Sequence, residues 1–137
     1  MGAKPVNIYL DSSAIIYGIE GTEDLRKAVL ARMADVEQTG GVFSTSRLSR
    51  LECRVLPLRR GQTAVIARYD NFFLRRSLNL IEIGSSIIDL ATELRVRYGL
   101  KTPDAIHVAT AMECGADLIL TGDRDMVRMK EIKVELL

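Results

Sequence analysis

The sequence predicts an α/β fold in three layers, a parallel sheet of about five strands with one layer of helices on each side. Short, almost continuously apolar segments alternate with longer segments in which apolar residues recur at helical spacing. Helical connections make neighbouring strands parallel and cover both faces of the sheet, so such strands carry few polar residues. The 137 residues suffice for one such domain and are too few for two ordinary ones.

Five segments have the composition of buried strands, because they are short, aliphatic and bounded by polar residues or glycine. We expect these strands at residues 6–10, 42–45, 80–83, 118–121 and 132–134. Asp11 directly follows the first strand, and Asp123 lies two residues beyond the end of the fourth. The ends of two strands therefore carry an acid.

The amphipathic segments between the strands are predicted as helices, several of them preceded by a polar residue that can cap the first turn. Ser46, Ser86 and Thr102 are expected caps, and Pro103 is expected at the first helical position after Thr102. Pro57 is expected to interrupt the helix that follows Ser46. The predicted helical segments cover residues 25–36, 48–55, 65–73, 87–94 and 102–114.

The overall composition is that of an ordinary folded protein, with 47% apolar and 27% charged residues. No apolar run is long enough to cross a membrane, and the apolar stretch at the N-terminus is too short for a signal peptide, so we expect a cytoplasmic protein. Cys53 and Cys114 belong to no CxxC or Cys/His cluster, which argues against a zinc site or a disulfide framework. Both are interpreted as small buried apolar residues.

The net charge of +1 hides an uneven distribution. Residues 47–76 contain eight arginines and two acids, a balance of +6, whereas the segments before and after balance at −2 and −3. Guanidinium groups bind phosphate oxygens two at a time, so the arginine-rich segment is a candidate surface for nucleic acid. A solvated helical surface is the alternative.

Two of the acids occupy positions typical of functional sites in open α/β sheets. Such sites form outside the carboxyl ends of the strands, where the strand order reverses. The first and fourth strands are the usual neighbours there, and Asp11 and Asp123 follow them. Asp104, in the first turn of its helix, either points toward the same crevice or only stabilises the helix dipole.

Glu52 is the fourth candidate acid, in the arginine-rich helix. It follows Ser49 by three residues, so a capping box is one alternative. An ion pair with Arg47 or Arg50 is another. If all four carboxylates converge, they would repel one another and raise each other's pKa without a cation, and they would suit Mg²⁺ or Mn²⁺. An oxygen-only site beside an arginine-rich surface indicates phosphodiester hydrolysis.

With these motifs in place, the chain resembles the PIN domains, and among them the VapC toxins, over nearly its whole length. The first motif is a strand followed by an Asp, small hydroxyl residues and aliphatics. The second is a helix carrying an acid, and the remaining two contain Asp104 and Asp123. The matching segments are residues 9–16, 46–52, 100–111 and 116–125.

The resemblance implies a single PIN domain over residues 1–137, with a five-stranded parallel sheet in the order 3-2-1-4-5. It implies an endoribonuclease that uses Mg²⁺ or Mn²⁺, is a homodimer and is silenced by a VapB-like antitoxin. The implied metal-binding and catalytic acids are Asp11, Glu52, Asp104 and Asp123. The residues implied to support them are Thr121 and Ser12 or Ser13. Arg47 and Arg50, which flank Glu52, are our candidates for binding the RNA backbone.

Several positions leave alternatives open. Asp125 is a second candidate in the last motif, although Asp123 lies nearer the strand end, and Asp125 can instead support or cap the following turn. Gly122 is less usual there than a bulkier polar residue, so we expect a looser loop. His107 follows Asp104 by three residues and is interpreted as a histidine without chemistry.

Two other functions agree less well with the sequence. A non-catalytic PIN-like module that binds RNA or protein would have no need of four acids. A phosphatase with an aspartyl nucleophile would want a second acid two residues after Asp11, where Ser13 stands, and no GxxxxGK[ST] loop is present. Aromatic residues 69, 72 and 73 could stack on bases, but are better interpreted as core residues or the lining of a partner groove.

Overall fold

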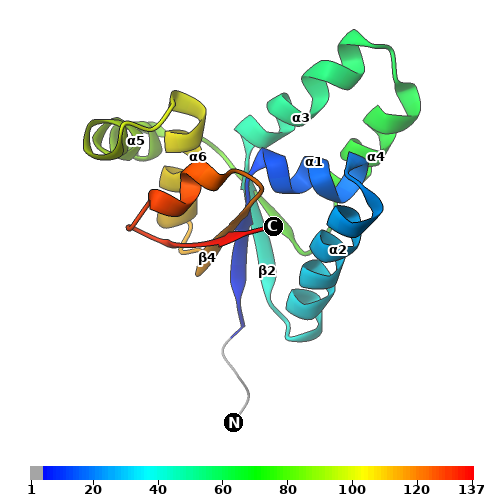
Figure 1. Ribbon diagram of the computed structural model, residues 1–137, viewed down its shortest axis with the longest axis horizontal. Coiled ribbons are helices and arrows are strands. Elements are labelled where there is room, and N and C mark those ends of the chain that lie inside the picture. The colour runs from blue at the N-terminus through cyan, green and yellow to red at the C-terminus, as the bar shows by residue number, and fades with distance from the viewer. Residues whose placement is uncertain (1–4) are drawn as a thin grey trace.

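A five-stranded parallel sheet forms the centre of the computed structural model, which describes residues 5–137. The strand order is β3-β2-β1-β4-β5, as predicted, and every neighbouring pair is parallel. Figure 1 shows the helices arranged around this sheet. The strands are β1 (Asn7–Leu10), β2 (Val42–Ser46), β3 (Leu78–Ile81), β4 (Leu118–Thr121) and β5 (Lys133–Leu136).

Six α-helices and one short 3₁₀ helix connect the strands. The first four helices and one face of the sheet enclose one apolar core. The last two helices, the 3₁₀ helix and the opposite face of the sheet enclose the other. Successive side chains of β1 point to opposite faces of the sheet, so Ile8 and Leu10 lie in the first core and Tyr9 lies in the second. The helices are α1 (Ser12–Glu20), α2 (Glu23–Gln38), α3 (Arg47–Arg59), α4 (Thr63–Phe73), α5 (Ser85–Tyr98), α6 (Thr102–Glu113) and η1 (Arg124–Arg128).

The strand order reverses between β1 and β4. Leu10 pairs with Leu120, and the backbone N–H of Asp11 donates to the carbonyl of Leu120 at 3.4 Å. The connections that leave these strands go to opposite sides, β1 toward α1 and β4 toward η1. This opens the crevice in which α/β proteins place their sites.

Several local predictions were wrong. Helix α1 was not expected, and it forms directly after β1 because the carboxylate of Asp11 accepts the backbone N–H of Ala14. Helix α3 continues through Pro57 to Arg59. The proline lies in the last turn, where it removes a single hydrogen bond, so the helix ends normally two residues later.

Two predicted caps are also corrected. Gly84, not Ser86, occupies the cap position of α5, and Lys101, not Thr102, occupies that of α6. Thr102 is therefore the first helical residue, and Pro103 is the second. Neither helix has a side-chain cap, and β3 begins two residues earlier than predicted. Within residues 5–137, the structure contains no helix with the length and apolarity needed to cross a bilayer.

Candidate active site

Asp11 forms the base of the crevice and is almost completely buried, with 4% of its surface exposed. Its Oδ1 accepts the hydroxyl of Ser13 at 2.6 Å and the N–H of Ala14 at 3.0 Å. Its Oδ2 accepts the hydroxyl of Thr121, which reaches it from the neighbouring strand. These donors fix the carboxylate in one orientation.

The loop after β4 is tied to the same network. The N–H of Asp123 donates to the hydroxyl oxygen of Thr121 at 3.0 Å, and the N–H of Gly122 donates to that of Ser13 at 2.9 Å. We predicted that Gly122 would loosen this loop, and the structure shows the opposite. A Cβ there would lie 2.1 Å from Cε2 of Tyr17, so the glycine permits close packing of the loop against α1.

Asp123 and Asp125 have different roles in this loop. The carboxylate of Asp123 accepts the N–H of Asp125 at 2.9 Å and caps η1. Asp123 is half-buried, whereas Asp125 is exposed in the first turn. The position of Asp123 next to the Thr121–Asp11 contact makes it the better candidate ligand. At the start of α1, it is Ser13 that contacts Asp11.

The pKa of Asp104 reflects the charges of the acids around the crevice. Its half-buried position raises the pKa of its carboxyl group, and the negative charge of Asp123 raises it further. His107 opposes this shift, and the charges of Asp11 and Glu52 add to it. The charges of the other three predicted acids therefore all act on Asp104, as expected for clustered carboxylates.

Glu52 does not make either of the contacts considered as alternatives. Helix α3 is capped by Ser46, so Ser49 and Glu52 form no capping box. The carboxylate of Glu52 instead contacts Nε2 of His107 at 2.7 Å. Arg47 pairs with Glu82 at 2.7 Å, and Arg50 pairs with Asp70 at 3.2 Å.

His107 and Tyr9 are the site residues that sequence reasoning missed. His107 is buried and its Nδ1 contacts the hydroxyl of Tyr9 at 2.8 Å, so both ring nitrogens are engaged. The spacing of three residues after Asp104 was a usable signal, because such residues share a helix face. Tyr9 gave no signal, since it stands among the apolar residues of a buried strand.

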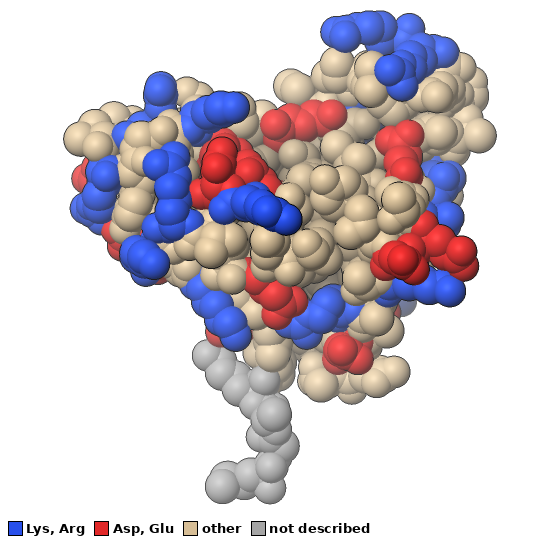
Figure 2. Space-filling model, viewed as in Figure 1, with Lys and Arg blue, Asp and Glu red and all other residues tan. Residues whose placement is uncertain are grey.

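The arginines of α3 do not pair with the four candidate acids. Figure 2 shows acidic side chains on both sides of the recess between α6 and α3. Basic side chains gather where α3 and α4 meet, far from the sheet. Arg59 and Arg60 are exposed there. Asp70 binds both Arg50 and Arg54, and the guanidinium of Arg50 also lies 5.7 Å from the ring centre of Phe73.

The donors at the crevice suit a hard divalent cation in chemistry and charge. All four are carboxylates, and burial together with the negative charges of Asp123, Asp11 and Glu52 raises the pKa of Asp104. In the arrangement seen here, no three acidic, histidine or cysteine side chains of residues 5–137 are placed to hold a metal ion. Asp11, Glu52 and Asp123 are each engaged in the protein hydrogen bonds described above.

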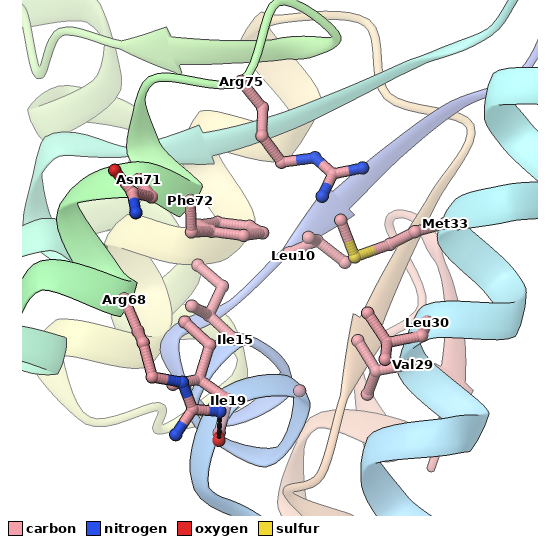
Figure 3. A pocket seen from close by; sticks show the side chains of 11 residues that line it. Leu10, Ile15, Ile19, Val29, Leu30, Met33, Arg68, Asn71, Phe72 and Arg75 are labelled. Atoms are coloured by element: carbon pink, nitrogen blue, oxygen red, sulfur yellow. Dashed lines mark hydrogen bonds between the residues drawn. The ribbon is translucent and has the colours of Figure 1, made fainter. Parts of the chain in front are cut away.

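A separate apolar cleft of about 280 Å³ opens between α1, α2 and α4. Figure 3 shows Ile15, Met33 and Phe72 facing one another across it, with Arg68 and Arg75 at its edges. Phe72 is half-buried in this lining, as expected of a residue that packs or lines a groove. The other two aromatic residues, at 69 and 73, are buried in the core and cannot stack on bases.

Comparison with known proteins gives consistent matches. A family model described as the PIN domain matches residues 8–132. Ribonuclease VapC46 of Mycobacterium tuberculosis is 35% identical over 117 residues, which cover 81% of this chain and 78% of that protein.

Solved structures match the fold over nearly the whole chain. VapBC2 of Rickettsia felis, bound to a promoter DNA fragment, superposes with a TM-score of 0.76 at 14% identity and covers 96% of this chain and 99% of its own. VapC20 of Mycobacterium tuberculosis, described as a toxin that cleaves the sarcin-ricin loop, superposes with a TM-score of 0.69 at 19% identity, covering 92% and 98%. Matches at these identities establish the fold.

Proposed function

Because this chain belongs to the PIN domain family, we propose that it is a ribonuclease that uses Mg²⁺ or Mn²⁺ to hydrolyse RNA phosphodiester bonds within the chain. The observation that carries the proposal is the network at the carboxyl ends of β1 and β4, where Thr121 binds Asp11 and the backbone of Asp123. Burial and the charges of Asp123, Asp11 and Glu52 all raise the pKa of Asp104 on α6. Similarity to Ribonuclease VapC46 supports the substrate class. We further propose that it acts as the toxin of a toxin–antitoxin pair in the cytoplasm, as one domain over residues 1–137.

Different residues of the chain would bind the cation and the RNA. Asp11, Glu52, Asp104 and Asp123 would hold the cation, with Ser13 and Thr121 fixing Asp11. When bound, the cation supplies positive charge at the phosphate and makes a water molecule more acidic. Arg47 and Arg50 would bind the RNA backbone beside Glu52, in competition with the carboxylates that now pair with them.

The experiment is an RNA cleavage assay with purified protein, in EDTA and after addition of Mg²⁺ or Mn²⁺. Cleavage should depend on the cation, and Asp104→Asn should reduce it by more than about a hundredfold, since loss of outer partners of a metal site alone costs up to that factor. Asp89→Asn, an exposed acid on α5, is the control and should cleave normally. Cation-independent cleavage, or full activity of Asp104→Asn, would reject the proposal.

The apolar cleft supports an antitoxin as the partner. Its lining comes from α1, α2 and α4, and Arg68 and Arg75 border it, which suits an amphipathic helix with acidic residues along its edges. A solved toxin–antitoxin complex from Klebsiella pneumoniae shares this fold, with a TM-score of 0.68. Leu30→Glu, at a lining residue that is 48% exposed, should abolish co-purification with a co-expressed VapB-like antitoxin, while RNA cleavage persists. Unchanged co-purification would place the partner elsewhere.

A second copy of the chain is the proposed dimer partner. Leu51, Val55 and Leu58 form an exposed apolar row on α3, with 59%, 40% and 53% of their surfaces accessible. Residues at this spacing lie on one face of a helix, and exposed rows of this kind mark interfaces. Light scattering should give twice the monomer mass for the wild type and the monomer mass for Leu51→Glu. A monomeric wild type would contradict the dimer.

A further inference from the structure

The imidazole of His107 is held at both nitrogens. Nε2 lies 2.7 Å from Oε1 of Glu52, and Nδ1 lies 2.8 Å from the hydroxyl oxygen of Tyr9. The three residues come from α3, α6 and β1. The His107 side chain is 3% exposed, Tyr9 is fully buried and Glu52 reaches the solvent with 27% of its side chain. The chain of contacts thus runs from the core to the crevice.

The chemistry of the groups fixes the direction of the bond to Glu52 and allows Tyr9 to donate at the other nitrogen. An ionised carboxylate only accepts hydrogen bonds, so Nε2 carries a proton and donates it to Glu52. The hydroxyl of Tyr9 carries a proton that it can donate to Nδ1. A ring with its proton on Nε2 that accepts the Tyr9 hydroxyl at Nδ1 satisfies both neighbours, and the bond that one nitrogen makes selects the tautomer at the other.

Without His107, the carboxylate of Glu52 would have other partners. Arg47, Arg50 and Arg54 lie within about one or two turns on the same helix. These arginines instead pair with Glu82 and Asp70. Within residues 5–137, the His107–Glu52 contact is the side-chain hydrogen bond that joins α3 to α6. It turns Glu52 away from the arginines and toward the helix that carries Asp104.

We propose that His107, oriented by Tyr9, is a positioning residue that fixes the carboxylate of Glu52 beside the other three acids and so sets the affinity of the site for a divalent cation. This inference rests on the proposed function. Hydrogen-bond partners of metal-binding carboxylates commonly affect affinity in this way. Neither His107 nor Tyr9 needs to contact the cation or the RNA.

The first test uses NMR without metal. His107 is the only histidine of the chain, so a long-range ¹H–¹⁵N spectrum contains one imidazole. We expect the tautomer with the proton on Nε2 in the wild type, an upfield shift of that proton in Glu52→Gln, and a changed Nδ1 signal in Tyr9→Phe. A proton on Nδ1 alone, or an Nε2 signal unaffected by Glu52→Gln, would overturn the inference.

The second test measures Mn²⁺ affinity by calorimetry on folded variants. His107→Phe should weaken binding about tenfold to a hundredfold. His107→Gln, which keeps an amide donor, should recover most of the loss. Adding His107→Phe to Glu52→Gln should change the affinity less than about twofold, because residues that act through one contact are not additive. Thr110→Val, a buried change one turn away on α6, is the matched control and should bind normally.

The outcomes separate the two claims. A wild type that fails to bind Mn²⁺ overturns the proposed function and the affinity claim together. A wild type that binds, with His107→Phe binding equally well, overturns only the positioning role. Multiplicative losses in the double variant would likewise show that His107 acts independently of Glu52.

Discussion

The hydroxyl of Thr121, at the end of β4, donates to Oδ2 of Asp11, immediately after β1. This contact joins the central strand β1 to its neighbour β4 at the point where the strand order reverses, and both residues are buried. The same hydroxyl oxygen accepts the N–H of Asp123. One threonine therefore orients one candidate ligand and positions the backbone of another.

Replacing Thr121 by valine should reduce stability, because it leaves a buried carboxylate oxygen and a backbone N–H without their partner. We expect a loss of about 1–3 kcal/mol in the free energy of unfolding, measured by urea denaturation. Thr110→Val is the control, since the Thr110 hydroxyl binds only the carbonyl of Ile106 in its own helix and should contribute little. Equal losses in the two variants would contradict the role of Thr121.

Neutralising Asp104 should stabilise the cation-free protein. The folded-state pKa of Asp104 is raised by burial and by neighbouring acids, so its ionisation opposes folding. The stabilising effect of protonation is fully present below the unfolded pKa and is lost as pH rises through the raised folded pKa. In EDTA, the Tm of Asp104→Asn should exceed that of the wild type at pH 7, and the difference should shrink toward pH 4.

Asp11→Asn should have the opposite effect on stability. All the hydrogen bonds described for Asp11 are accepted by its carboxylate oxygens, and asparagine replaces one of them with a donor. We expect a lower Tm than the wild type under the same conditions. A higher Tm for Asp11→Asn would mean that charge repulsion outweighs these bonds at the base of the crevice.

Arg47 should contribute to RNA binding without reading the sequence. It is exposed, and its partner Glu82 is more exposed still, so phosphate can displace that pair at small cost. In the Asp104→Asn background, Arg47→Gln should weaken binding equally for unrelated RNAs and make the salt slope shallower by about one unit or slightly less. Arg97→Gln on α5 is the control. An unchanged slope would assign the arginine to a solvated surface.

The strand pattern made the sheet predictable, because continuous aliphatic segments and helical crossovers leave few alternatives. β4 was predicted without error, since Leu118–Thr121 is bounded on both sides by polar residues or glycine. Helix α1 was not predicted, because its nine residues are too few to show a clear helical periodicity. The carboxylate of Asp11 caps this helix and also binds Thr121 of β4, and only the structure shows the second contact.

The site was predictable in its acids and not in their surroundings. Asp11 and Asp123 follow strand ends, a position that sequence reveals directly. The partner of Glu52 could not be predicted, because arginines two and five residues away are obvious partners in the sequence, whereas His107 is 55 residues distant. Only the tertiary structure brings α3 and α6 together. Gly122 was misinterpreted for the same reason, since its neighbour Tyr17 lies on another element.

The central claim is that the four acids form one cation site, and Mn²⁺ binding monitored by electron paramagnetic resonance tests it most directly. The wild type should bind Mn²⁺ with loss of the free-ion signal, Mg²⁺ should compete, and Asp89→Asn should behave as the wild type. Asp104→Asn and Asp123→Asn should each lose this binding while remaining folded. Wild-type Mn²⁺ affinity in both of those variants would contradict the account.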